Sequence, residues 1–66
     1  MKEEQRQHAI ASYVDYMRRF AANPNKATAG NLQDACNKAL KLGIINKTTY
    51  EKDLKYIELT LRKFGK

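Results

Sequence analysis

The chain of 66 residues lacks several residue patterns that stabilise or equip small proteins. It has one cysteine, Cys36, and one histidine, His8, so no internal disulfide forms and no zinc-binding spacing such as CxxC or HxxxH exists. Its three glycines are isolated, which excludes a glycine-rich phosphate loop. No stretch approaches the roughly 20 apolar residues that a membrane-spanning helix needs. We therefore expect no metal site, no cofactor, no membrane partner and no small-molecule substrate.

Acidic residues are scarce as well. Seven Asp and Glu stand against thirteen Lys and Arg, which gives a net charge of +6 and a pI near 9.7. Such an excess favours anionic partners, namely nucleic acid, acidic proteins or anionic membrane surfaces. The first ten residues carry two glutamates and no apolar run, unlike a signal peptide. We expect a cytoplasmic protein.

Apolar residues recur three and four positions apart in three segments of the chain. This spacing places them on one face of a helix, and it predicts helices over about residues 3–22, 28–42 and 48–64. A chain of this length has room for a single domain, residues 1–66, with one small core. The connections between the segments are short, so neighbouring helices should be antiparallel. The sequence thus predicts an all-α, compact three-helix bundle.

The ends of the second and third helices have their own signals. The second helix starts either at Pro24 or near Thr28, since both residue types are common at helix starts. Gly43 fits the left-handed position that ends many helices. Thr48 followed by Glu51 matches a capping box at the start of the third helix. These signals leave the start of the second helix open between two positions.

The apolar stripes define a predicted core. The middle stripe contains small residues, which should let both neighbouring helices approach it closely. The predicted core residues are Ile10, Tyr13, Val14, Met17, Phe20 and Ala21 in the first helix, Leu32, Ala35, Cys36, Ala39 and Leu40 in the second, and Tyr50, Leu54, Ile57, Leu61 and Phe64 in the third.

The chain offers little from which to build a catalytic site, which needs a nucleophile or an acid–base pair held in a cleft. Cys36 lies on the predicted buried stripe, where a thiol usually acts as a small inert hydrophobe. His8 lies near the start of the first helix, before its apolar stripe becomes strong. Glu58 has Arg62 one turn later, an ordinary surface pairing. We expect a protein that is not an enzyme, and we assign no catalytic residue.

The second and third segments also resemble a helix-turn-helix at their junction. Ala39, Gly43 and Ile44 have the spacing of such turns, and INKTTY is similar to the start of a recognition helix. The resemblance departs from the motif at Thr49 and Lys52, where the recognition helix should present apolar residues. A plain helical hairpin fits the sequence better.

The third segment carries a basic face opposite its apolar stripe, and this face contains no acid. Residues 44–66 hold six cations against three acids, whereas residues 1–22 hold four against three. A face that meets only solvent has no need of a tyrosine and a leucine at its centre, although charge runs are often simply solvated. We name this set the outer face: Lys52, Lys55, Tyr56, Leu59, Arg62, Lys63 and Lys66.

Two functions fit the outer face. The first is a non-enzymatic binding module, a small basic helical nucleic-acid-binding or regulatory protein that contacts phosphates. The alternative is a protein–protein interaction module, an adaptor or inhibitor that docks an acidic surface of a larger protein with Tyr56 and Leu59 as anchors. A homodimer is a further arrangement, since a small core without disulfide or metal gains from self-association.

Overall fold

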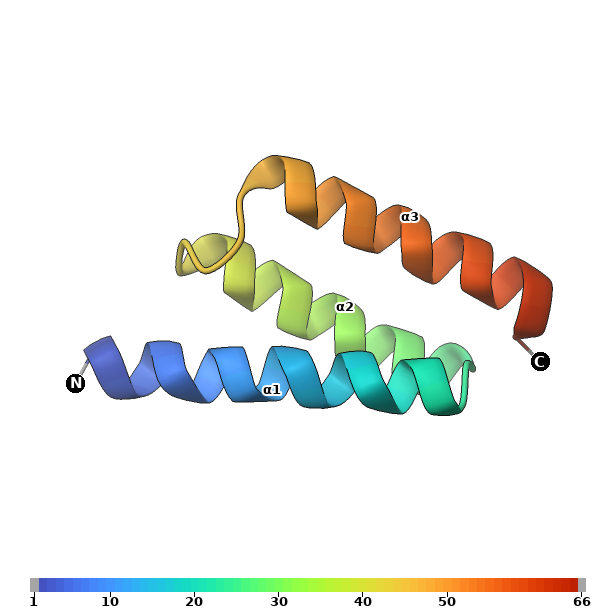
Figure 1. Cartoon of the computed structure of the whole chain (residues 1–66), viewed down its shortest axis with the longest axis horizontal. Helices are drawn as coiled ribbons and strands as arrows, with labels where there is room; N and C mark the ends of the chain where they lie inside the picture. Colours follow the sequence, from blue (N-terminus) through green and yellow to red (C-terminus); the bar gives the residue numbers. More distant parts are fainter. Residues whose placement is uncertain (1, 66) are drawn as a thin grey trace.

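The computed structural model describes residues 2–65 and folds into three α-helices. These are α1 (Lys2–Ala22), α2 (Lys26–Lys41) and α3 (Lys47–Phe64). Each helix runs antiparallel to the next: in Figure 1, α1 runs from left to right, α2 returns, and α3 runs from left to right again. The predicted all-α three-helix bundle is confirmed, and the helix bounds lie within two residues of the predicted ones. None of the helices in the described chain is long and apolar enough to cross a membrane.

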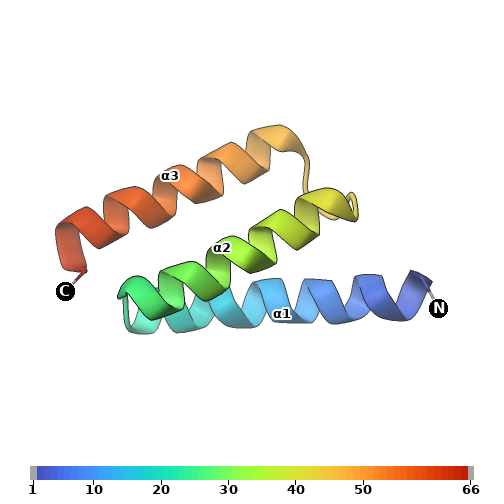
Figure 2. The same cartoon turned by 180° about the vertical axis from the view of Figure 1, so that it is seen from behind.

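Helix α2 is the centre of the bundle. It packs against both other helices, whereas no Cα of α1 lies within 8 Å of a Cα of α3 in the described chain. In Figure 1, α1 and α3 lie nearer the reader, and Figure 2 shows α2 in front of them from the other side. The bundle is flat, with extents of 39 × 21 × 13 Å. As a result α1 and α3 each have a side that no helix of the described residues covers.

Asparagines cap α2 and α3, in place of the predicted residues. Asn25 Oδ1 accepts from the amide of Thr28 at 2.9 Å, and the Thr28 hydroxyl accepts from the amide of Asn25 at 3.1 Å. Thr28 is therefore the third residue of a capping box whose N-cap is Asn25, and α2 begins at Lys26, between the two predicted starts. Asn46 Oδ1 accepts from the amide of Thr49 at 2.8 Å, so the predicted cap at Thr48 is wrong.

The predicted end of α2 at Gly43 is confirmed. Gly43 has φ +77°, a conformation that costs glycine little because it lacks a Cβ atom. The amide of Ile44 donates to the carbonyl of Ala39 at 2.9 Å, and the amide of Gly43 donates to the carbonyl of Leu40 at 3.1 Å. These two bonds form a Schellman motif, which turns the chain toward α3.

Helix α3 returns alongside α2 and does not cross it (Figures 1 and 2). In a helix-turn-helix the two helices cross at about 90–120°. The Tyr50 hydroxyl donates to Asn37 Oδ1, a bond that ties the start of α3 to the second half of α2. The interpretation as a plain helical hairpin is confirmed.

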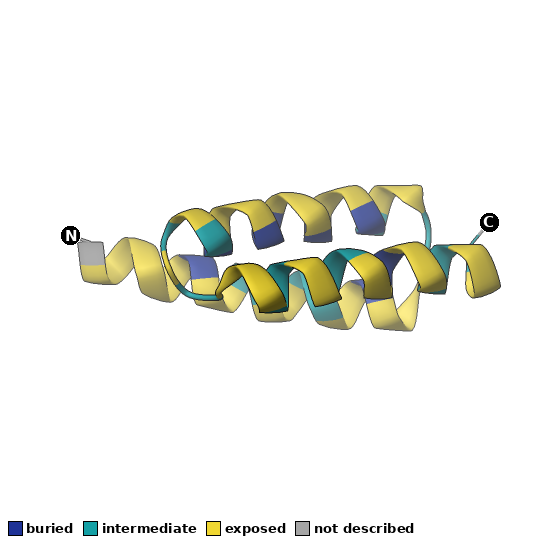
Figure 3. Cartoon of the chain, turned by 90° about the horizontal axis from the view of Figure 1, so that it is seen from above, coloured by how far each residue is buried: buried dark blue, intermediate teal, exposed yellow. Residues whose placement is uncertain are grey.

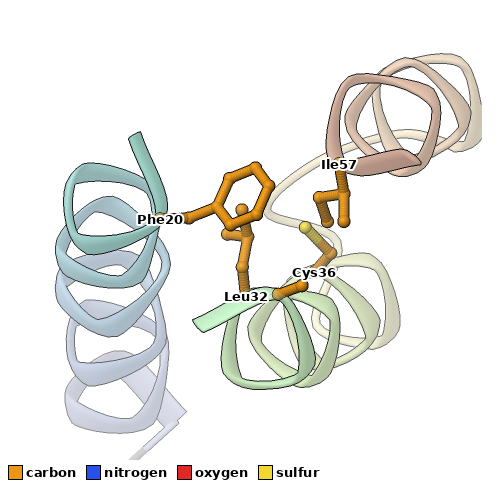
Figure 4. Packing of buried hydrophobic residues seen from close by; sticks show 5 residues of the cluster. Phe20, Leu32, Cys36 and Ile57 are labelled. Carbon is orange, nitrogen blue, oxygen red and sulfur yellow. The ribbon is translucent and has the colours of Figure 1, made fainter. Parts of the chain in front are cut away.

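The core forms where all three helices face one another. Figure 4 shows Phe20 of α1, Leu32 and Cys36 of α2, and Ile57 of α3 pointing toward a common centre. Phe20, Leu32 and Cys36 are fully buried, and Ile57 is 6% exposed. All four belong to the predicted core. Partly buried side chains pack around them, namely Tyr13, Tyr16, Met17, Tyr50 and Leu61.

The predicted core of α1 is too wide. Ile10 and Val14 are each 41% exposed, and Ala21 is exposed too, whereas the unpredicted Ala9 is buried. Successive residues turn by about 100° around a helix, which places Ile10 and Val14 beyond Tyr13, away from the side of α1 that meets α2. A fourth helix would cover these two side chains, and residues 2–65 provide none.

The prediction that Phe64 belongs to the core is wrong, because its side chain is 63% exposed. Asp53 contacts Cys36 across the antiparallel pair of helices. Eleven residues further along α3, Phe64 comes level with Asn25, which is the N-cap of α2. Phe64 therefore lies at the very end of the helix on which it would have to pack.

Candidate binding surface

Every described cation of the outer face of α3 is exposed to solvent. On the opposite side of the helix, Ile57 is buried in the core. That orientation of α3 turns the outer face away from α2. Figure 3 shows this surface of α3 largely in the colour of exposed residues. The predicted site residue Lys66 lies outside the described residues. The exposed cations are Lys52, Lys55, Arg62 and Lys63.

The lysines of the outer face are not engaged by acids of this chain. Arg62 Nη2 donates to Glu58 Oε2 at 3.1 Å, and both side chains are more than half exposed. Such exposed pairs contribute little and exchange readily with other partners. Between residues 2 and 65, neither Lys52, Lys55 nor Lys63 forms an ion pair. The three ammonium groups are therefore available to an external anion.

Tyr56 and Leu59, the two apolar side chains of the outer face, differ in their surroundings. The Tyr56 ring meets the Phe20 ring edge to face, with centroids 5.7 Å apart and planes at 80°. This contact joins α3 to α1 and leaves Tyr56 39% exposed. Leu59 is 51% exposed and takes no part in the core cluster. Tyr56 is thus partly structural, and Leu59 is the more available anchor.

Asp53 joins the three helices, a role that the sequence analysis missed. The Tyr13 hydroxyl of α1 donates to Asp53 Oδ2, and the Cys36 thiol of α2 lies 3.8 Å from the same oxygen. Tyr13 and Asp53 are 40 positions apart, so no local pattern marks the pair. One signal was available: Asp53 precedes Ile57 by one helical turn, which places it at the edge of the apolar stripe.

The surroundings of the cluster formed by Tyr13, Cys36 and Asp53 keep the Tyr13 hydroxyl and the Cys36 thiol protonated. Burial raises the pKa of the Cys36 thiol from its ordinary 9.0 to about 12, and the charge and hydrogen bond of Asp53 act in the same direction. Burial, followed by the hydrogen bond and charge of Asp53, also holds the pKa of Tyr13 well above its ordinary value. A thiol that is protonated at neutral pH is a poor nucleophile and metal ligand. Cys36 therefore contributes packing and a weak hydrogen bond.

A shallow depression of about 240 Å³ lies between α1 and α2, on the side away from α3. It is open to solvent, and none of its side chains is hydrogen-bonded to another within the described range. No three His, Cys, Asp or Glu side chains of residues 2–65 converge in a way that would hold a metal ion. The depression is lined by His8, Ser12, Tyr16, Asn31, Asp34, Ala35 and Lys38.

The surface has no counterpart from which a function can be carried over. No protein-family model, curated protein or solved structure matches this chain.

Proposed function

We propose that this protein is a non-enzymatic module that binds nucleic acid through phosphate contacts made by the outer face of α3. The proposal rests on one observation: the described part of this face presents four exposed cations and no acid. We place the protein in the cytoplasm, where a single cysteine such as Cys36 stays reduced.

The spacing of the cations suits a phosphate backbone. Lys52 and Lys63 are eleven residues apart, which corresponds to about 16 Å along a helix. Lys55 and Arg62 lie between them, so the charges form a row along the helix. Each cation that neutralises a phosphate releases condensed counterions, and this release drives binding that does not depend on base sequence. The face offers no Asn, Gln or central Arg for reading base edges.

The salt dependence of binding tests this function. With four phosphate contacts, the affinity for duplex DNA or RNA should fall about 100-fold between about 50 and about 200 mM salt, measured by fluorescence anisotropy. The double variant Lys55→Glu with Arg62→Glu should bind at least about 100-fold more weakly at low salt, because two attractive charges become repulsive.

A matched control separates the outer face from net charge alone. Lys26→Glu with Lys41→Glu makes the same change in net charge at exposed positions of α2. This control should retain most of the affinity, and circular dichroism should show both double variants folded. Binding that is insensitive to salt, or equal loss in the two double variants, would contradict the assignment to α3.

The exposure of Leu59 favours a second candidate function, the docking of an acidic protein surface on the outer face. A half-exposed leucine surrounded by cations matches an interface with an apolar centre and a charged rim. Leu59→Asp separates the two functions, since it removes an apolar anchor while leaving every cation in place. It should weaken protein docking strongly and phosphate binding about twofold to fivefold, the latter through one added negative charge.

A further inference from the structure

The uncovered side of α1 carries an apolar stripe that the proposed phosphate contacts do not use. Ile10 and Val14 are one turn apart and are each 41% exposed, and Met17 continues the stripe toward the core. Isolated surface hydrophobes are ordinary in soluble proteins, whereas large contiguous apolar patches with a polar rim mark interaction sites. The spacing of four and three is the one with which a helix packs against another helix.

The stripe and the outer face of α3 lie on the same side of the bundle. Tyr13 reaches Asp53 and Phe20 reaches Tyr56, so α1 and α3 face one another at the same level and in parallel. Successive side chains are about 100° apart around the axis of α1. Ile10 and Val14 therefore lie beyond Tyr13, on the side of α1 that is turned away from α2. This is the side turned toward the reader in Figure 1, opposite to the side on which α2 lies. We name the resulting surface the open face: Ile10, Val14, Tyr56 and Leu59.

Cations surround the open face. Arg18 follows Val14 by one turn and is exposed, and Lys52 precedes Tyr56 by one turn on the opposite helix. Neither forms an ion pair with a described residue. The acid that adjoins the stripe, Asp15, directly follows Val14, and its carboxylate is already paired with Arg19 at 2.8 Å. Arg18 on α1 and Lys52 on α3 therefore leave uncompensated positive charge beside the open face, and a partner must bring negative charge to it.

We propose that the open face docks an acidic amphipathic helix of another protein, which packs its apolar stripe on Ile10, Val14 and Leu59 and places its acids beside Arg18 and Lys52. This inference rests on the second candidate function and names its surface and partner class. The occupant completes the bundle as a fourth helix, the common mode in which an amphipathic helix covers an apolar surface between two others. Charge argues against a second copy of this chain, because the two open faces would bring like charges together at a net charge of +6 each.

A pair of synthetic helical peptides tests the charge and the surface together. The first has a leucine stripe flanked by glutamates, and the second replaces every glutamate by lysine. The fluorescently labelled acidic peptide should bind the full chain, whereas the lysine peptide should bind at least tenfold more weakly. Ile10→Asp and Val14→Asp should each weaken binding of the acidic peptide at least tenfold. Ala27→Asp, at an exposed position of α2, adds the same charge and should leave binding unchanged.

The outcomes separate this inference from the functions on which it builds. If Leu59→Asp abolishes peptide binding while Ile10→Asp and Val14→Asp do not, docking on α3 stands and the open face is refuted. Equal binding of both peptides overturns the charge argument. A dimeric mass in size-exclusion light scattering that Val14→Asp reduces to a monomer assigns the face to a second copy instead. If Val14→Asp weakens duplex binding as much as the Lys55 and Arg62 double variant does, the face belongs to nucleic acid and the inference is wrong.

Discussion

Asp53 is the residue at which all three helices meet. Its carboxylate accepts a hydrogen bond from the Tyr13 hydroxyl of α1, and the Cys36 thiol of α2 points at the same oxygen. The backbones of α1 and α3 do not approach one another closely. The bond to Asp53 and the edge-to-face pair of Phe20 and Tyr56 therefore join α1 to α3 directly, in addition to the core that Phe20 and Ile57 share.

Tyr13→Phe should lower the free energy of unfolding by about 1 to 3 kcal/mol, because it leaves a partly buried carboxylate without its strongest donor. Urea denaturation followed by circular dichroism measures the change. Tyr16→Phe is the matched control, since Tyr16 is also partly buried and its hydroxyl makes no hydrogen bond within residues 2–65. The control should stay within about 0.5 kcal/mol of the parent. Equal losses in the two variants would show that the bond to Asp53 contributes nothing particular.

Alkaline pH should weaken the fold through the same cluster. The folded pKa of Cys36, about 12, lies above its ordinary value of 9.0, so the unfolded chain releases this proton first. The stabilisation that the protonated Cys36 thiol contributes is complete below about pH 9, and it is lost as the pH rises toward 12. Cys36→Ala should show a shallower decline of the unfolding free energy over this range than the parent. Parallel curves for the two proteins would disprove the linkage to Cys36.

At the scale of the helices, asparagines cap the N-terminal ends of α2 and α3. Each asparagine precedes the threonine that was expected to form the cap. The Asn25 and Asn46 side chains each accept from the amide three residues later. Threonines sit close to both positions, at Thr28 and Thr48, and have the same capping chemistry. Which oxygen caps a helix depends on the residue at which the backbone enters the helical conformation, and here that residue is Lys26 for α2 and Lys47 for α3.

Asn46→Ala should destabilise the protein by about 1 kcal/mol, since the first turn of α3 loses its side-chain acceptor. Thr48→Ala, which removes the predicted cap, should change the stability by less than about 0.5 kcal/mol. Thermal melts of the two variants give the comparison directly. A larger loss for Thr48→Ala than for Asn46→Ala would restore the capping box that the sequence suggests.

At the scale of the whole molecule, the bundle is a flat arrangement of two outer helices on one shared helix. The radius of gyration is 11.8 Å, slightly above the value of about 11 Å that is usual for a compact domain of this length. The small residues of α2 permit both contacts, with Ala29, Cys36 and Ala39 buried beneath the neighbouring helices. The flatness leaves apolar surface on α1 and at the end of α3.

Ile57→Ala should cost about 2 to 5 kcal/mol, a large part of the stability of a domain of this size, because Ile57 joins α3 to the core. Phe64→Ala removes a larger side chain from the same helix but should cost less than about 0.5 kcal/mol, because Phe64 is 63% exposed. Chemical denaturation of both variants tests the assignment. A loss for Phe64→Ala comparable to that for Ile57→Ala would mean that the last turn of α3 is packed in solution.

The sequence by itself determined the three helices, the stop at Gly43 and the central core residues Phe20, Leu32, Cys36 and Ile57. Periodicity and turn chemistry are local properties, and they can be read without knowing the neighbours. The outward direction of the lysines on α3 follows from the same periodicity, because one buried residue fixes the rotation of a helix.

Only the tertiary structure decided which apolar residues are covered. Ile10, Val14 and Phe64 have the spacing of core residues, but burial requires a neighbouring helix, and three helices that share α2 leave these positions uncovered. The structure also joined Tyr13 to Asp53 and turned Tyr56 against Phe20, contacts between residues more than 30 positions apart. A pattern along the chain specifies one helix face at a time, whereas exposure depends on how many helices surround that face.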